Sequence, residues 1–462
     1  ISMNKSLVFS FFILANLFSA VSFGRSVSNH PYGLIVVLIY FVIQRNIKFG
    51  LAKPFRSIAL FITIYLTLSS LVLFINPSLE TTAIENILLC ISYLSYIVFM
   101  IQFSLNEIVV GTMIGFAPIA LYSLFIELPL YFFNRSLLFS FREALGLRLS
   151  YVQPPLAFFM EGSHAPAAYI FLIQCLSIFA MLRKKLANHI TNSFIFTCVL
   201  VLELTLALTH ISGLQFFSFW LPLLLFIGSI QLRKYISKEA TLFGNFKKIN
   251  KAILSSFLVA LLASPIWFSY IKQKIGLTYD LDHSSASRFL AFITGIYDAG
   301  HNLLMPIGIA QYSYTRIESL TNILNNELFR SLHHTFLYAS ERAFINSDSA
   351  IYSLVGYFFS ECGILAFLFF TPFITNFFKT IRICYMYNRR SDQPIVLQLA
   401  LICGLGAPSM YLFNMSLGYP RILPYALVSL FVSWKFGKYL TNNFSLSPKF
   451  NRLIETSKIT DT

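Results

Sequence analysis

Long apolar stretches, each near 20 residues, alternate with short polar segments along most of the chain. About 20 consecutive apolar residues are needed for an α-helix to cross a bilayer. The pattern therefore predicts an all-α polytopic membrane protein with about twelve transmembrane helices. The twelve predicted spans lie near residues 6–23, 32–44, 57–75, 84–102, 109–127, 166–182, 191–210, 215–231, 252–271, 350–377, 394–414 and 421–440.

Composition agrees with this pattern. Of the 462 residues, 56% are hydrophobic and 11% are charged, whereas soluble domains carry about 25% charged residues. We therefore interpret residues 1–462 as a single integral membrane domain. The first span begins after Met3-Asn4-Lys5 and lacks a small-x-small cleavage site, so we expect a retained signal anchor.

Lysine and arginine are unevenly distributed among the segments between spans. They gather in loops 45–56, 183–189, 232–251 and 378–393 and in the tail after residue 434, whereas the alternate short loops hold only Arg25. Basic loops stay on the cytoplasmic side of a membrane, so both termini are predicted to be cytoplasmic. Most of the net charge of +15 is then a topology signal, and no nucleic-acid partner is expected.

This topology leaves two long loops on the outer side, 128–165 and 272–348. Long irregular segments usually carry function. The larger loop is nearly neutral, with six basic and seven acidic residues, so it is not a patch for anionic lipid. A mixed polar surface of this kind is typical of a site that handles sugars.

A helix with an anion site is predicted near the start of the larger loop. Ser284, Ser285 and Ser287 are N-cap candidates, and an apolar stripe follows at Phe289, Phe292, Ile293 and Ile296. Arg288 would lie in the first turn, where free N–H groups and the helix dipole also favour an anion. The alternative is that Arg288 pairs with Asp282 or Asp298 on a solvated face.

Further polar residues cluster at the predicted outer surface. A second helix is expected over 317–340, lying on the membrane surface, with His333 and His334 near its end. Arg148 lies in the smaller loop, Glu161 and His164 stand at the outer mouth of the sixth span, and Arg421 begins the last span. Glu161 is alternatively a carboxylate that simply contacts water. Glu361 lies inside a span, where ionisable residues usually have a role.

The sequence gives little support for metal or nucleotide chemistry. Asp280-Leu281-Asp282 is an Asp-x-Asp pair without other supporting ligands, and no phosphate-binding or dinucleotide-binding glycine loop is present. We therefore expect no metal and no cofactor.

Three places resemble motifs of the bacterial O-antigen polymerases (Wzy-type), which are related to the O-antigen ligases. The first is the serine-rich stretch with Arg288, its helix, and the turn at Pro306 and Gly308. The second is Arg148 with Glu161-Gly162-Ser163, and the third is Glu361-Cys362-Gly363. Gly162 stands where the family usually has proline, and Ala310 replaces the second glycine of the turn.

The resemblance implies a fold similar to the C-type glycosyltransferases (GT-C), in the bacterial inner membrane, acting in lipopolysaccharide biosynthesis. Such an enzyme joins oligosaccharide repeat units on undecaprenyl diphosphate at the periplasmic face, with undecaprenyl diphosphate as the leaving group. It implies that Arg148, Arg288 and Arg421 converge on the diphosphate without a metal. The candidates for the catalytic base are Glu161, His164, His333 and His334. A Wzz-type chain-length regulator and a flippase are the implied protein partners.

Two other functions compete with this interpretation. An O-antigen ligase would transfer the chain to lipid A core, and only the acceptor distinguishes it. A twelve-span transporter or flippase would instead place its polar groups in a closed cavity at the membrane midplane. Polar groups converging at the outer face favour the transferase.

Overall fold

The computed structural model describes residues 4–17, 32–44, 47–75, 80–134, 136–138, 140, 164–186, 283–301, 318–319, 321–323, 325, 353–388, 395–417 and 422–443. These residues form helices and no strand. The elements in chain order are α1 (Lys5–Leu17), α2 (Tyr32–Ile43), η2 (Lys53–Phe55), α3 (Arg56–Ile75), α4 (Glu80–Met100), α5 (Leu105–Tyr122), η4 (Ser123–Glu127), α6 (Leu128–Phe133), α8 (His164–Leu186), α13 (His283–His301), α17 (Leu354–Cys362), η6 (Gly363–Leu365), α18 (Ala366–Asn388), α19 (Ile395–Leu417) and α20 (Leu423–Asn443).

The all-helical prediction is confirmed for the described residues. Three helical segments are long and apolar enough to cross a membrane, namely Lys53–Leu71, Leu105–Glu127 and Leu354–Thr380. Shorter apolar helices lie in five of the other predicted spans, and α20 occupies the last one. The predicted spans between residues 191 and 271 lie outside the described residues. The chain is therefore a helical protein with membrane-spanning character.

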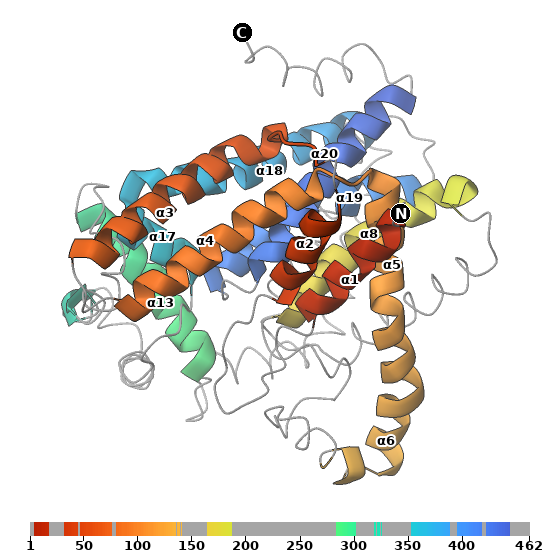
Figure 1. Ribbon diagram of the computed structural model, residues 1–462, viewed down its shortest axis with the longest axis horizontal. Helices are drawn as coiled ribbons and strands as arrows, with labels where there is room; N and C mark the ends of the chain where they lie inside the picture. The colour runs from red at the N-terminus through yellow and green to blue at the C-terminus, as the bar shows by residue number, and fades with distance from the viewer. Residues whose placement is uncertain are drawn as a thin grey trace, which may run out of the picture.

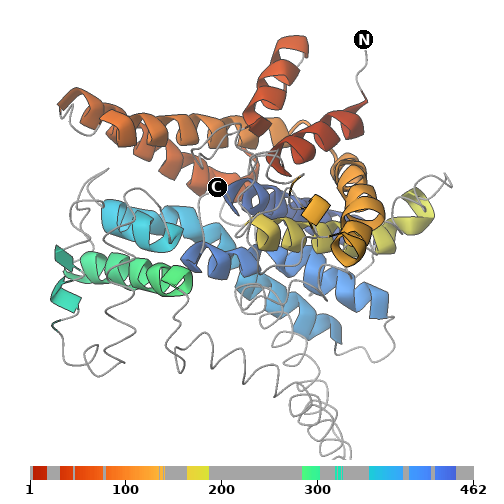
Figure 2. The same cartoon turned by 90° about the horizontal axis from the view of Figure 1, so that it is seen from below.

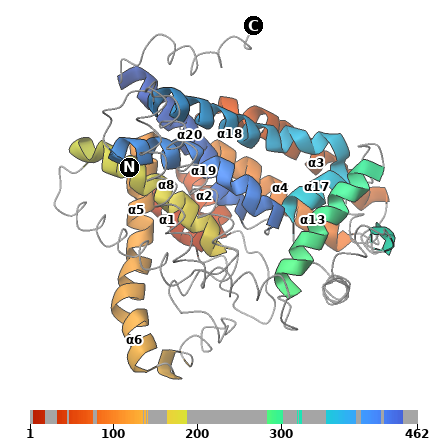
Figure 3. The ribbon, with the colours of Figure 1, turned by 180° about the vertical axis from the view of Figure 1, so that it is seen from behind.

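Two predicted spans agree with apolar segments of the structure but differ from them in detail. The fifth, near 109–127, matches Leu105–Glu127, and the helix continues beyond it through a π-helical turn, η4, into α6, which projects away from the other helices (Figures 1 and 3). The tenth, near 350–377, matches Leu354–Thr380. It is broken at Gly363, so that α17 is a separate helix of 9 residues.

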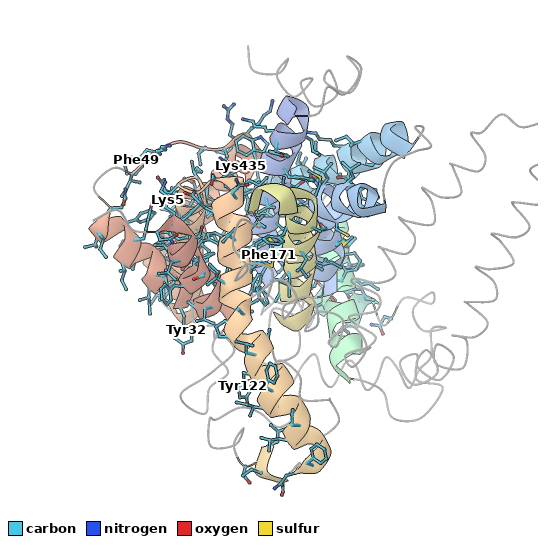
Figure 4. The ribbon with its side chains drawn as sticks, turned by 90° about the vertical axis from the view of Figure 1, so that its right-hand side faces the viewer. Lys5, Tyr32, Phe49, Tyr122, Phe171 and Lys435 are labelled. Atoms are coloured by element: carbon cyan, nitrogen blue, oxygen red, sulfur yellow. The ribbon has the colours of Figure 1, made fainter. Side chains whose placement is uncertain are left out.

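The described lysines Lys5, Lys48 and Lys435 lie at one end of the helices. Lys5 Nζ donates to the backbone carbonyl oxygen of Gln102 at 3.0 Å. The side-chain amide of Gln102 donates to the Lys48 carbonyl oxygen at 2.8 Å and accepts from the Lys48 N–H at 3.0 Å. Figure 4 shows Lys5 and Lys435 near this end and Tyr122 toward the other. We refer to it as the basic end and to the opposite end as the far end.

Helices α1 and α5 meet through glycines. A Cβ on Gly111 would lie 2.6 Å from the backbone oxygen of Ser6, and one on Gly115 would lie 2.9 Å from that of Ser10. Small residues four apart allow two helix backbones to approach closely, as is common inside membranes. Beside this seam the rings of Phe9, Phe12, Tyr40, Phe99 and Phe103 form one buried aromatic cluster.

Helices α8, α19 and α20 form a second layer that is held by buried polar contacts. The Gln174 amide of α8 donates to the carbonyl oxygens of Gly404 in α19, at 2.9 Å, and of Ser429 in α20, at 3.1 Å. The Tyr411 hydroxyl donates to the carbonyl oxygen of Ala167 at 2.6 Å. Such bonds between helices fix their relative positions. Helix α19 also contacts α13, so it lies between α8 and α13.

Candidate functional site

The candidate site lies where α13 packs against α17. The two helices are side by side in Figures 1 and 3, near the end of α3 and the start of α4. Figure 2 shows the same pairing from below. The predicted helix with the serines and Arg288 is therefore confirmed. It begins at His283, so Ser284 and Ser285 lie inside its first turn and not at its N-cap.

The apolar stripe of α13 is not the face that meets the protein. Ile296 is 43% exposed, and Phe292 and Ile293 are only partly buried. The buried face instead carries small and polar side chains, at Ala291, Thr294, Gly295, Asp298 and Ala299. Small residues occupy the buried face because they allow the two helix backbones to come into contact. Bulky apolar residues on the outer face are typical of helices in lipid.

Two glycines make the contact between α13 and α17 possible. A Cβ on Gly295 would collide with the backbone of Gly356, and a Cβ on Gly356 would collide with the backbone oxygen of Ala291. In contrast, a Cβ on Gly300 would meet nothing within 4 Å. The residue type is therefore required at the crossing but not elsewhere on α13.

A buried carboxylate joins α13 to α17 just beyond this crossing. Asp298 is 2% exposed, and its carboxylate accepts hydrogen bonds from the hydroxyls of Ser360, at 2.8 Å, and Ser319. Burial raises the pKa of the Asp298 carboxyl, and the two serine donors partly offset that rise. The suggestion that Asp298 and Arg288 pair on a solvated face fails for Asp298, which is not solvated.

Glu361, the next residue after Ser360, is the centre of a second buried network. The Tyr65 hydroxyl of α3 donates to its Oε2 atom at 2.6 Å and lies 3.2 Å from the Tyr357 hydroxyl. Asn86 of α4 donates to Tyr357 at 3.2 Å. Glu361 is fully buried, so this network satisfies a group that is costly to bury alone. It ties α17 to α3 and α4.

Helix α17 ends at Cys362, the residue after Glu361. Gly363 has φ 53° and ψ −129°, a conformation that is open mainly to glycine. At the other end of α17, the Ser353 hydroxyl caps the helix by accepting from the Gly356 N–H at 3.1 Å. Helix α17 is thus a short, capped segment, docked on α13 by its glycine and on α3 and α4 by its carboxylate.

Three of the site residues predicted from sequence fall within the described helices. Glu361 is buried, Arg288 lies in the second turn of α13, and His164 is the first residue of α8. In the predicted helix over 317–340, residues 318–319 and 321–323 are helical. The remaining predictions lie outside the described residues, namely Arg148, Glu161, Pro306, Gly308, His333, His334, Arg421 and the Asp280–Asp282 pair.

Sequence reasoning missed most of the groups that surround the two carboxylates. These are Tyr65, Asn86, Ser319, Tyr357 and Ser360. Asn86 carried a usable signal, because an amide within an apolar span needs a partner. The tyrosines carried little, since the chain has 24 of them. Within the described residues, no three His, Cys, Asp or Glu side chains gather as metal ligands would.

Comparisons of the chain with protein-family models, with curated proteins and with solved structures give no match.

Proposed function

We propose that the protein is an O-antigen polymerase, a glycosyltransferase that joins oligosaccharide repeat units carried on undecaprenyl diphosphate. One observation carries the proposal. Helix α13, with its serines and Arg288, docks directly on α17, which ends in Glu361-Cys362-Gly363. Two of the three places that resemble the family are therefore neighbours in space, although more than 50 residues separate them in sequence.

The reaction requires stabilisation of a departing diphosphate. In the proposed mechanism, the glycosidic bond to the diphosphate of the donor breaks while an acceptor hydroxyl attacks the sugar. Arginine suits the leaving group because it stays charged and binds phosphate oxygens with a planar fork. We assign this role to Arg288 on α13, together with Arg148 and Arg421. The base that takes the acceptor proton is one of Glu161, His164, His333 and His334.

The packing of α13 supports a lipid-linked substrate. Its small face meets the protein, while Ile296 and the partly exposed Phe292 and Ile293 face outward. A helix with this distribution fits the boundary of a bilayer, where an apolar surface meets lipid chains. In the proposed orientation, α13 lies at the outer surface of the inner membrane and the basic end faces the cytoplasm. The diphosphate of a lipid carrier would then reach Arg288 from the same layer.

Glu361 serves this site as a positioning residue. It is fully buried and bonded to Tyr65, so its carboxylate is held away from an incoming sugar. Its tie to α3 and α4 holds α17, and α17 holds α13. Asp298 acts in the same way through Ser360 and Ser319.

A transporter or flippase is the second candidate, because one observation favours it. Discontinuous helices with buried polar groups often form binding sites in transporters. The helix break at Gly363 matches that description, because it lies two residues after the buried Glu361. Glu361 in turn contacts Tyr65, which lies near the middle of α3. Such a protein would move the lipid-linked sugar without joining two units.

The decisive experiment uses purified protein in detergent, with the undecaprenyl-diphosphate repeat unit, EDTA and no nucleotide. Polymerase activity gives a ladder of multiples on a gel. The Arg288→Ala protein should lose about 10²–10³ in rate, the effect of removing one preorganised charge-stabilising donor. Arg288→Lys should retain part of the rate, because it keeps the charge but not the fork. Arg56→Ala, at the basic end, is the matched control and should leave the ladder unchanged.

Three other outcomes contradict the polymerase or the role of Arg288. A product formed only when lipid A core is supplied would identify a ligase. No product, combined with movement of the lipid-linked sugar across a proteoliposome membrane, would identify a flippase. A ladder that is equally weakened in Arg56→Ala and Arg288→Ala would remove Arg288 from the site.

A further inference from the structure

Lysines from two separate segments meet at the basic end. Lys48 follows α2, and its backbone is fixed on both sides by the Gln102 amide. Lys435 and Lys438 lie one turn apart on α20. The Lys435 ammonium group is partly buried, and the charges of Lys438 and Lys48 repel it. We name Lys48, Lys435 and Lys438 the lysine cluster.

Acidic side chains balance the lysine cluster only in part. Glu107 is the carboxylate that acts on Lys435. That carboxylate also accepts a hydrogen bond from the Ser104 N–H at 2.7 Å, while the Ser104 hydroxyl accepts from the Glu107 N–H at 3.3 Å. This reciprocal pair is the capping box of α5. Among the described residues, Glu107 is thus the carboxylate that acts on Lys435, and it already caps α5, so the lysine cluster keeps an excess of positive charge.

Aromatic rings hold two of the lysines at the surface. Lys438 Nζ lies 4.0 Å from the centroid of the Trp434 ring, and Lys435 Nζ lies 5.2 Å from that of Phe431. These cation–π contacts orient the ammonium groups, while Lys48 and Lys438 stay exposed. Tryptophan at this position is typical of the boundary between lipid and water.

Exposed apolar side chains follow Lys48 directly. Phe49 is 84% exposed and Leu51 is 48% exposed, in a segment between α2 and α3. Figure 4 shows Phe49 at the same end of the molecule as Lys435. Apolar side chains next to lysines at the end of spanning helices suit the boundary of a bilayer, where chains are apolar and headgroups are charged.

We propose that the lysine cluster and Trp434 bind the headgroup phosphate of an anionic phospholipid, with Phe49 and Leu51 in contact with its acyl region. This site is at the opposite end from α13 and does not depend on the polymerase proposal. An anionic lipid has a negative headgroup that complements the lysines and an apolar chain that complements Phe49 and Leu51. A soluble anion supplies only the first.

Native mass spectrometry of the purified protein in detergent measures this binding with phosphatidylglycerol as the probe. Near an anionic membrane surface, each lysine contributes a factor of about five in affinity. Lys435→Gln/Lys438→Gln should therefore bind phosphatidylglycerol about 30-fold more weakly. Lys53→Gln/Lys379→Gln removes the same charge from the same end, at a neighbouring lysine pair, and should change the affinity by less than fivefold.

Further measurements separate the lipid from other causes. Phosphatidylcholine should show no difference between wild type and either variant, and Phe49→Ser should weaken phosphatidylglycerol alone. Equal losses in the two double variants would reduce the effect to diffuse charge and overturn the site. An unchanged affinity in Lys435→Gln/Lys438→Gln would overturn it as well. If inorganic phosphate displaces the lipid at equal concentration, the site binds a free anion and the lipid assignment is wrong.

Discussion

The α1–α5 seam and the α13–α17 seam are both built on glycines, yet they enclose different chemistry. Around Gly111 and Gly115 the nearest side chains are those of Phe9 and Ile13, with a cluster of aromatic rings beside them and no carboxylate of the described residues in contact. Around Gly295 and Gly356 the neighbours include two buried carboxylates, Asp298 and Glu361.

The difference separates a structural seam from a functional one. Aromatic packing tolerates change, because many weak contacts share the free energy. A buried carboxylate does not, since it destabilises the protein unless every partner is in place. Two buried carboxylates at one seam therefore destabilise the fold unless their partners are all present. Such an arrangement is typical of regions whose geometry serves a function. The predictions below test this contrast in order of decreasing effect.

The largest effect is expected at the helix crossing itself. Gly295→Ala would place a methyl group against the backbone of Gly356, where no side chain can move aside. Overpacking usually costs about 1–3 kcal/mol, and here α13 should separate from α17. We expect the ladder-forming activity to fall by at least about 100-fold, because a small misplacement of a positioned group can cost that much.

Gly300→Ala is the matched control for this variant. It changes the same residue type on the same helix, in a place with no neighbour within 4 Å, and should keep wild-type activity. Limited proteolysis reports undocking independently of activity. Equal activity of the two variants would show that the α13–α17 contact does not position the site.

The next effect concerns the carboxylate of Glu361. Glu361→Ala removes the carboxylate that accepts from the Tyr65 hydroxyl, and a buried group that loses its partner costs about 1–3 kcal/mol. Glu361→Gln keeps an acceptor oxygen and should lose less. The melting temperature in detergent should fall in the order wild type, Glu361→Gln, Glu361→Ala. The reverse order of the two variants would mean that the Glu361 carboxylate destabilises the fold instead of joining α17 to α3 and α4.

Part of this site was predictable from sequence and part was not. The serines and the helical spacing predicted a helix where α13 lies, although it begins at His283, before all three N-cap candidates. Glu361 was conspicuous as a charge inside a span. The orientation of α13 could not be predicted from its apolar stripe, because in a membrane protein such a stripe can face either the core or the lipid. The partners of Glu361 could not be predicted, since Tyr65 lies 296 residues away in sequence and only the folded arrangement brings it close.

A weaker effect is expected from the ionisation of Asp298. Burial raises the pKa of this carboxyl above its ordinary value of 3.8, so the folded protein favours the neutral form. The resulting contribution to stability is fully present below the unfolded pKa and is lost as the pH rises through the folded pKa. Asp298→Asn cannot ionise, so its melting temperature should fall less than that of wild type as the pH is raised from about 4. Parallel curves for the two proteins would show that Asp298 ionises without cost.

The smallest effect on function belongs to the aromatic seam. Phe99 is fully buried, and its ring lies 4.7 Å from that of Phe103 and 5.0 Å from that of Phe12. Phe99→Leu keeps an apolar side chain but loses the ring contacts, which should cost about 1 kcal/mol. The ladder should remain unchanged, because this seam holds no group near α13. The informative comparison is with Glu361→Gln at a similar loss of stability. If both variants melt earlier and only Glu361→Gln loses activity, then the polar seam positions the site. If both lose activity equally, then stability alone explains the effect, and the contrast between the two seams disappears.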